Sequence, residues 1–146
     1  MIKDIASKCV EDLQKKIEAI NANANGLLWV YSEANFLNAS KGINFPAVGV
    51  IYEGMRGNSE NEKTTNKIGG SGSLVVSLIL AHNNGNFAGG SEIFNATAIL
   101  DEMRSAIIDT KSPTGHKWRF VVEAPSEEKN GGVIWLQRWD TPVMIV

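Results

Sequence analysis

Apolar side chains near the start of the chain recur every three or four residues. This spacing over residues 1–24 predicts a helix with one buried stripe. Acid and base four residues apart, as in Glu11 with Lys15 and Asp12 with Lys16, predict that the opposite face is exposed to solvent. Asparagine and glycine between residues 21 and 26 predict the helix end. The stripe consists of Ile2, Ile5, Cys9, Leu13, Ile17 and Ile20.

Short runs rich in β-branched and aromatic residues follow, and these predict strands. In one run Leu74, Val76, Leu78 and Leu80 alternate with other residues, which indicates a half-buried strand. In another, the same alternation predicts that Trp118, Phe120 and Val122 point inward. Pro142 is expected to separate the last strand from an apolar tail at 143–146. The predicted strands are 27–31, 45–54, 73–82, 117–123 and 133–140.

A second helix is predicted from Ser91, a favourable N-cap, over about 19 residues. Lys111 and Pro113 are expected to end it. Residues 55–69 have almost no apolar content, which predicts a long mobile loop. Residues 70–72 are predicted to be a flexible segment that leads into the next strand. The buried stripe of this helix is predicted to be Ile93, Ala96, Leu100, Met103 and Ile107.

The resulting order, α-β-β-β-α-β-β, predicts the α+β class in a single domain, 1–146. Its most economical packing is one mostly antiparallel or mixed sheet of about five strands with two helices packed on one face. Two helices cover only one face, so the aromatic residues of the sheet favour burial of the second face or an edge by partner subunits. The alternative, that these aromatics fill a single core, is equally open. They are Trp29, Tyr31, Trp135 and Trp139.

Composition narrows the function classes. The 146 residues carry 14 Lys and Arg against 16 Asp and Glu, a net charge of −2, so the basic footprint of a nucleic-acid-binding protein is missing. No apolar run approaches the roughly 20 residues of a membrane span, and the charged start is unlike a signal peptide. One cysteine cannot form an internal disulfide, and two histidines with it barely supply a metal site.

Candidate chemistry is sparse. The glycine-rich stretch 85–91 has the spacing of a phosphate-binding loop. However, Ser91 occupies the position of the lysine in such a loop, and the negative charge of Glu92 would repel a bound phosphate. His82 and His116 fall at predicted strand ends, where a pair could bind metal or move protons. Cys9 lies on the apolar stripe, so a core thiol of raised pKa is expected. The sequence therefore predicts no catalytic, cofactor-binding or metal-binding residue.

Two segments carry a family resemblance. These are FPAVGVIYEG at 45–54, which opens on proline and closes on glycine, and the hairpin HKWRFVVEAPSEEKNGGVIWLQRWDTP at 116–142. With the order of elements, they resemble the tail-terminator (tail-completion) proteins of tailed bacteriophages.

The resemblance implies a structural virion protein without enzyme activity or cofactor. It implies a homo-oligomeric ring, a hexamer, that caps the tail tube and joins it to the head. The expected partners are tail tube and sheath subunits on one side and a head-completion or neck protein on the other, with DNA passing through the lumen without specific binding. The expected location is the head-proximal end of the virion tail, after assembly in the host cytoplasm. The alternative is a small cytosolic α+β ligand-binding or enzymatic domain with a site near His82 and His116.

Overall fold

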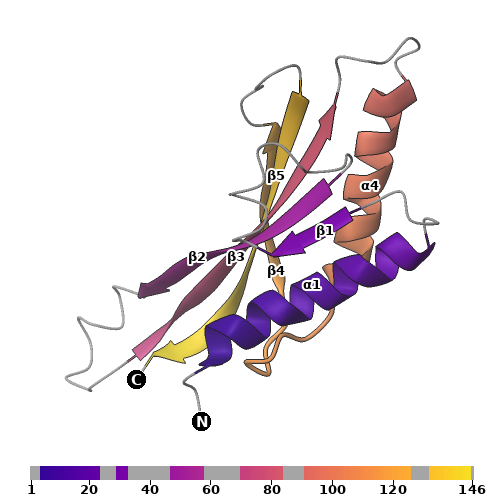
Figure 1. Cartoon of the computed structure of the whole chain (residues 1–146). Helices are drawn as coiled ribbons and strands as arrows, with labels where there is room; N and C mark the ends of the chain where they lie inside the picture. The colour runs from indigo at the N-terminus through magenta and orange to yellow at the C-terminus, as the bar shows by residue number, and fades with distance from the viewer. Residues whose placement is uncertain are drawn as a thin grey trace.

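The helices and strands follow one another in the predicted order (Figure 1). The computed structural model describes residues 4–23, 29–32, 47–57, 70–83, 91–125 and 132–145, and side chains within 4–20, 47–57, 71–81, 97–125 and 134–144. The elements are α1 (Ile5–Asn23), β1 (Trp29–Ser32), β2 (Ala47–Gly57), β3 (Gly70–Asn83), α4 (Ser91–Ile107), β4 (Arg119–Pro125) and β5 (Gly132–Ile145). The predictions for Ile2, residues 27–28 and 35–46, the stretch 58–69, the glycine-rich loop, the hairpin turn and Val146 fall outside the described residues.

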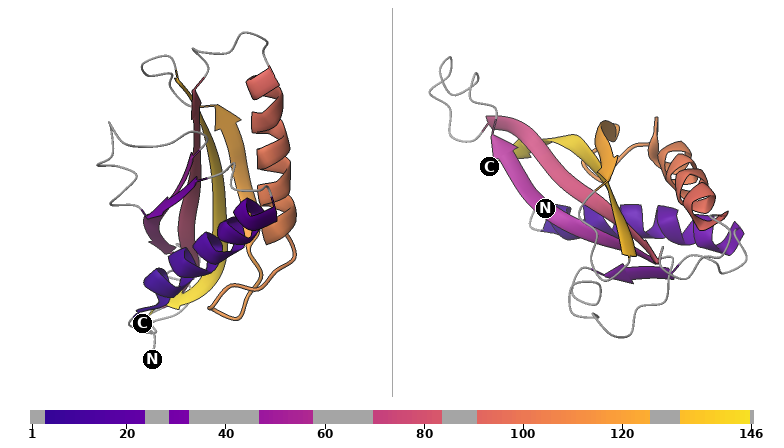
Figure 2. Two further views of the ribbon diagram at one scale, coloured as in Figure 1. Left: turned by 45° about the vertical axis from the view of Figure 1, so that its right-hand side comes forward. Right: turned by 90° about the horizontal axis from the view of Figure 1, so that it is seen from above.

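The strands form one five-stranded sheet in the order β1-β2-β3-β5-β4. β1 runs parallel to β2, and the other neighbours are antiparallel. Both helices pack on the same face of this twisted sheet (Figure 2). The α+β prediction, with a mixed sheet and two helices on one face, is confirmed.

The core lies between the two helices and the sheet. The α1 stripe is buried as predicted at Cys9, Leu13, Ile17 and Ile20, and α4 buries the last three positions of its own stripe. From the sheet, the four alternating residues of β3 are fully buried against the helices. Burial of side chains of this size stabilises by roughly 1.5–3 kcal/mol each. The core members of α4 and β3 are Leu100, Met103, Ile107, Leu74, Val76, Leu78 and Leu80.

β3 is more buried than its alternation predicted. Val75 and Ser77, which point away from the helices, are each 1% exposed, and Ala81 is 7% exposed. β3 is therefore not half-buried, because it is the central strand with β2 on one side and β5 on the other.

The loop predicted between β2 and β3 is shorter than expected. Residues 55–57 belong to β2 and 70–72 to β3. Residues 55–57 pair with 72–74 of β3, Arg56 with Ser73 and Gly57 with Gly72, whereas Gly70 and Ser71 pair with β5. A β-bulge between Tyr52 and Gly54 interrupts the ladder, and Gly54 has φ +109° there. The apolar period is lost at a bulge, so the sequence pattern ends early although the strand continues.

Helix α4 ends before the predicted stop. Its last residue is Ile107, and Asp109 adopts a left-handed conformation with φ 62°. The Thr110 amide donates to the Ile107 carbonyl at 3.1 Å. The helix is thus closed by a left-handed aspartate, a residue type that tolerates this region, and not by Lys111 or Pro113.

The alternation predicted for 117–123 holds only as far as Phe120, because β4 contains a second bulge, between Phe120 and Val122. Trp118 is 2% exposed as expected, and Phe120 lies on the side of the buried Trp139 as expected but stays 43% exposed at the edge of the sheet. Beyond the bulge Val122, predicted to point inward, pairs with Arg138 on the face away from the helices, and Glu123 reaches Gln137 in the core. A bulge shifts every following side chain to the other face.

Pro142 does not end the last strand either, since β5 continues to Ile145. The ladder with β4 stops at Asp140, so Pro142 has a strand neighbour only on the β3 side, where it pairs with Ser73. Proline is tolerated at a position whose N–H can face an unpaired edge.

The tryptophans of β5 support the single-core interpretation. Trp139 is fully buried, and Trp135 is half-buried against the same core. The side chains of Trp29 and Tyr31 lie outside the described set. Trp139 therefore needs no partner subunit to be buried, whereas burial of the exposed part of Trp135 by a partner stays a prediction.

Candidate assembly surfaces

Among the described side chains, large apolar residues are exposed on and beside β4, on β2 and at Met144 of β5, which is 63% exposed. Phe120 and Val121 on β4 are 43% and 42% exposed, and Ile108 beside them is 47% exposed. Met55 on β2 is 39% exposed. Exposed apolar side chains of this size are a typical mark of an interaction surface.

The β4 edge lies beside a hollow under α4. Phe120 and Trp139 form its floor from the sheet, with ring centroids 5.4 Å apart in an edge-to-face arrangement. Its volume is about 540 Å³. The remaining walls come from Asp101, Arg104, Ser105 and Ile108.

A buried polar network holds the β4 edge in place. Gln137 is fully buried, and its Nε2 donates to the Leu100 carbonyl of α4 at 3.3 Å and to Glu123 Oε1 of β4 at 2.9 Å. Its Oε1 accepts a hydrogen bond from Trp139 Nε1 at 2.8 Å. Arg104 completes the network through an ion pair with Glu123. One side chain of β5 thus ties β4 to α4, so the hollow is preformed.

The described part of β1, Trp29–Ser32, pairs with Ala47–Val50 of β2. A groove of about 360 Å³ lies between β2 and α1. Its apolar walls are Ala6, Val10, Val50 and Tyr52, with Ser7, Glu11 and Gln14 at the rim.

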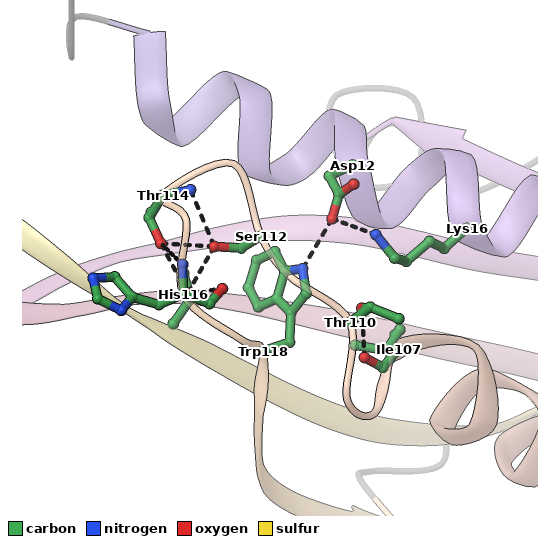
Figure 3. A network of polar contacts seen from close by, with 9 residues as sticks. Asp12, Lys16, Ile107, Thr110, Ser112, Thr114, His116 and Trp118 are labelled. Carbon is green, nitrogen blue, oxygen red and sulfur yellow. Dashed lines mark hydrogen bonds and ion pairs between the residues drawn. The ribbon is translucent and has the colours of Figure 1, made fainter.

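The connector between α4 and β4, residues 108–118, is held by polar contacts at both ends (Figure 3). Trp118 Nε1 donates to Asp12 Oδ2 at 2.9 Å, and the same oxygen accepts from Lys16 Nζ at 2.7 Å. Asp12 and Lys16 are therefore only 25% and 20% exposed, although the sequence placed them on a solvent face. This bond fastens the connector to α1.

Three hydroxyls fasten the other side of the connector to β5. Ser112 Oγ lies 2.7 Å from both Thr114 Oγ1 and Thr141 Oγ1, and Thr141 is fully buried. Thr141 Oγ1 also reaches the His116 carbonyl at 3.4 Å. The connector is thus an irregular but fixed segment, and it presents Lys111 and Lys117 to solvent.

The face of the sheet away from the helices carries two ion pairs that cross strands. Arg138 makes two contacts with Glu53, at 3.0 and 3.1 Å. Arg119 binds Asp140 at 2.7 Å and the Ser73 hydroxyl at 3.0 Å. These charges neutralise one another, so this face has little net charge there.

The histidines do not form a common site. The His116 carbonyl lies beside Thr141, which pairs with Leu74, whereas His82 stands eight residues further along β3. At about 3.3 Å per residue the two histidines are separated by roughly 26 Å along the strand. The alternative of a joint site at His82 and His116 is therefore contradicted.

Other candidate chemistry is equally limited within the described part of the chain. Cys9 is fully buried, and burial, with a smaller contribution from the charge of Asp12, raises its pKa to about 12. Among the described side chains there is no group of three potential metal ligands. No described helix has the length and apolar character needed to cross a bilayer.

Sequence reasoning missed the residues that form these surfaces. The sequence predicts Met55 in a mobile loop and Phe120 in the core, and it predicts no particular role for Gln137. The only available signal for Gln137 was a polar residue at an inward position between Trp135 and Trp139, since inward positions alternate along a strand.

Comparison with known proteins bears on the fold. No protein-family model and no curated protein sequence matches the chain. Among solved structures, a chain of the "Virion of native gene transfer agent (GTA) particle" superposes with a TM-score of 0.64. The match covers 97% of this chain and 98% of that chain at 12% sequence identity. The two chains therefore share a fold from end to end.

Proposed function

We propose that this protein is a structural component of a phage-type virion, and specifically its tail terminator. The observation that carries the proposal is the end-to-end match to a chain of a gene transfer agent virion. The resemblance of segments 45–54 and 116–142 to tail-terminator proteins supports the same role. In this role copies of the chain form a hexameric ring at the head-proximal end of the tail. The ring contacts tube and sheath subunits below and a head-completion or neck protein above.

The surfaces of the molecule suit such a role. Two hollows, one beside β4 and one between α1 and β2, can receive neighbouring subunits. The ion-paired face away from the helices is nearly neutral, as a lumen that conducts DNA without holding it requires. The protein acts by binding its neighbours and catalyses no reaction.

The test is complementation of particles that lack the protein. Deletion of its gene should give filled heads and separate tails in electron micrographs. Addition of the purified chain should restore joining, and gold-labelled chain should mark one end of each tail. A label on the head surface or at the tail tip, or joined particles in the deletion strain, would contradict the terminator role.

A further inference from the structure

A groove on the face of the sheet away from the helices gathers two arginines. Its volume is about 430 Å³, and it lies where β2 ends and β3 begins, at the end of the sheet away from α4 (Figure 1). Arg56 of β2 pairs with Ser73 of β3, and Ser73 pairs with Pro142 of β5, so these side chains share one face. Arg119 enters the groove from β4. The remaining wall residues are Gly57, Ser71 and Gly72.

The guanidinium of Arg119 is held in a fixed orientation. Its Nε donates to Asp140 Oδ1 at 2.7 Å, and its Nη2 reaches across β5 and donates to the Ser73 hydroxyl at 3.0 Å. A guanidinium carries five N–H donors, and these two bonds use two of them. The side chain is 53% exposed, so its other donors can bind a ligand from solution.

The described charges around the groove leave an excess of cations. Asp140 balances the charge of Arg119. Within the described ranges no carboxylate pairs with Arg56, which is exposed. On the adjoining connector Lys111 is exposed as well. The other charged groups of this face and of the connector form two ion pairs, Arg138 with Glu53 and Lys117 with Asp109.

Two guanidinium groups beside a hydroxyl are a suitable donor set for an oxyanion. The planar fork of a guanidinium matches the two oxygens of a carboxylate or of a phosphate. Arg56 comes from the β2 side of Ser73 and Arg119 from the β5 side, because β3 lies between β2 and β5. An oxyanion above Ser73 would therefore accept hydrogen bonds from both guanidiniums.

The surrounding charges favour the carboxylate of a protein over the phosphates of a nucleic acid. DNA carries one negative charge per roughly 1.7 Å of helix axis, so a duplex on this face would also bring phosphates against Asp140 and Glu53. The net charge of the chain is −2, and the basic footprint that holds a row of phosphates is missing. A single acidic side chain requires only the surplus charge of Arg56.

We propose that the groove between Arg56 and Arg119 binds an aspartate or glutamate side chain of a neighbouring virion protein. Arg119, fixed by Asp140 and Ser73, orients the carboxylate, and Arg56 binds it from the other side. The inference rests on the proposed assembly role and adds the chemistry of one contact. Exposed ion pairs are weak and are screened by salt, so this contact selects and orients the neighbour more than it adds affinity.

Titration with a blocked Gly-Glu-Gly peptide, followed by nuclear magnetic resonance, tests the site. The signals of Arg119 Nε–H and of the Gly57 and Ser73 amides should shift along one saturable curve. Arg56→Gln should raise the half-saturating concentration by about threefold or more. The matched control is Lys8→Gln, which removes the same charge from an exposed position on α1, on the other side of the sheet, and should leave the curve unchanged. Shifts that do not saturate, or equal effects of the two variants, would overturn the site.

Two further ligands decide which chemistry the groove prefers. A blocked Gly-Gln-Gly peptide should give no saturable shift, and a short DNA duplex should shift these signals less than the acidic peptide at equal ionic strength. Equal binding of the glutamine peptide, or tighter binding of DNA at these residues, would overturn the carboxylate assignment. The chain has acids of its own near Arg56 in sequence, Glu60 and Glu62. Peptide binding that requires Glu60→Gln and Glu62→Gln would overturn a site for a partner.

The joining assay separates this inference from the proposed function. Arg56→Gln should raise the chain concentration needed for half-maximal joining of heads and tails by about threefold or more, and Lys8→Gln should leave it unchanged. Equal joining by both variants and the unmodified chain would overturn the assembly contact and leave the terminator role intact. Failure of the unmodified chain to restore joining would refute the terminator role, and the peptide titration alone would then decide whether the groove binds a carboxylate.

Discussion

Replacement of Gln137 by leucine tests whether the buried polar network holds the β4 edge. Gln137 is fully buried and makes three hydrogen bonds. Two of the partner groups keep another partner after the change, because Glu123 retains Arg104 and the Leu100 carbonyl belongs to helix α4. Only the Trp139 indole N–H is left buried without an acceptor.

The expected loss of unfolding free energy follows from these hydrogen bonds. An orphaned buried donor costs about 1–3 kcal/mol, and each of the other two hydrogen bonds contributes about 0.5–1.5 kcal/mol. The leucine side chain regains part of this loss through apolar packing, so Gln137→Leu should lower the free energy of unfolding by about 2–4 kcal/mol. For a domain of this size that is a large part of a total of about 5–15 kcal/mol.

Urea unfolding followed by far-UV circular dichroism measures the change. Protein concentrations should be low and varied, because ring formation would add apparent stability. Gln14→Leu is the matched control: Gln14 is a half-buried glutamine at the rim of the α1 groove, and its change should stay within about 0.5 kcal/mol.

A double-mutant cycle decides whether the indole bond is responsible. Trp139→Phe removes the donor and leaves Gln137 Oε1 without it, so each single variant orphans one partner. The double variant orphans neither, and the cycle should give a coupling energy of about 1–2 kcal/mol. Additive losses, within about 0.5 kcal/mol, would refute the network as the origin of the stability.

The remaining predictions concern two backbone positions and the thiol. Gly54→Ala should destabilise the fold by about 1–2 kcal/mol in urea titrations, through φ +109° alone, since no atom lies within 4 Å of an added Cβ; no loss would contradict a positive φ at the bulge. Asp109→Val should lower the free energy of unfolding by about 1–2 kcal/mol, and Asp109→Gly should lower it by less than about 0.5 kcal/mol. Equal losses in the two variants would contradict a left-handed residue at the end of α4. Cys9 should resist aromatic disulfide reagents at pH 8 until urea unfolds the chain. Because its folded pKa of about 12 lies above the unfolded value of 9.0, its contribution to stability is complete below pH 9 and declines as the pH rises toward 12; Cys9→Ala should flatten that decline.

The elements that could be predicted from the sequence are those whose apolar period is unbroken. The α1 stripe from Cys9 to Ile20 and the alternation of β3 gave both the element and its buried face. The burial of the other positions depends on contacts with residues that are distant in the sequence. Whether β3 is buried on its second face depends on its central position, which no local pattern contains.

The errors in β2 and β4 share one physical cause. At Tyr52–Gly54 and at Phe120–Val122 a single extra residue reverses the alternation, so the strand pattern ends early in β2 and predicts the wrong face after the bulge in β4. These two strands also line the two hollows. The candidate assembly surfaces were therefore the part of the molecule that periodicity was least able to predict.

A weak contact between neighbouring subunits is an advantage for the proposed ring. Exposed fractions near 40% at Met55, Phe120 and Val121 leave these surfaces only moderately apolar, so two copies in dilute solution gain little by association. In an open chain of subunits the number of contacts is one fewer than the number of copies, whereas a closed ring has one contact for each copy. The closing contact is intramolecular and pays no further association entropy, so closure is favoured over further growth. A tube end that holds copies side by side would raise their effective concentration in the same way. The proposed terminator ring should therefore form cooperatively on tails at concentrations where the free chain is still monomeric, and parallel titrations with and without purified tails would measure that difference.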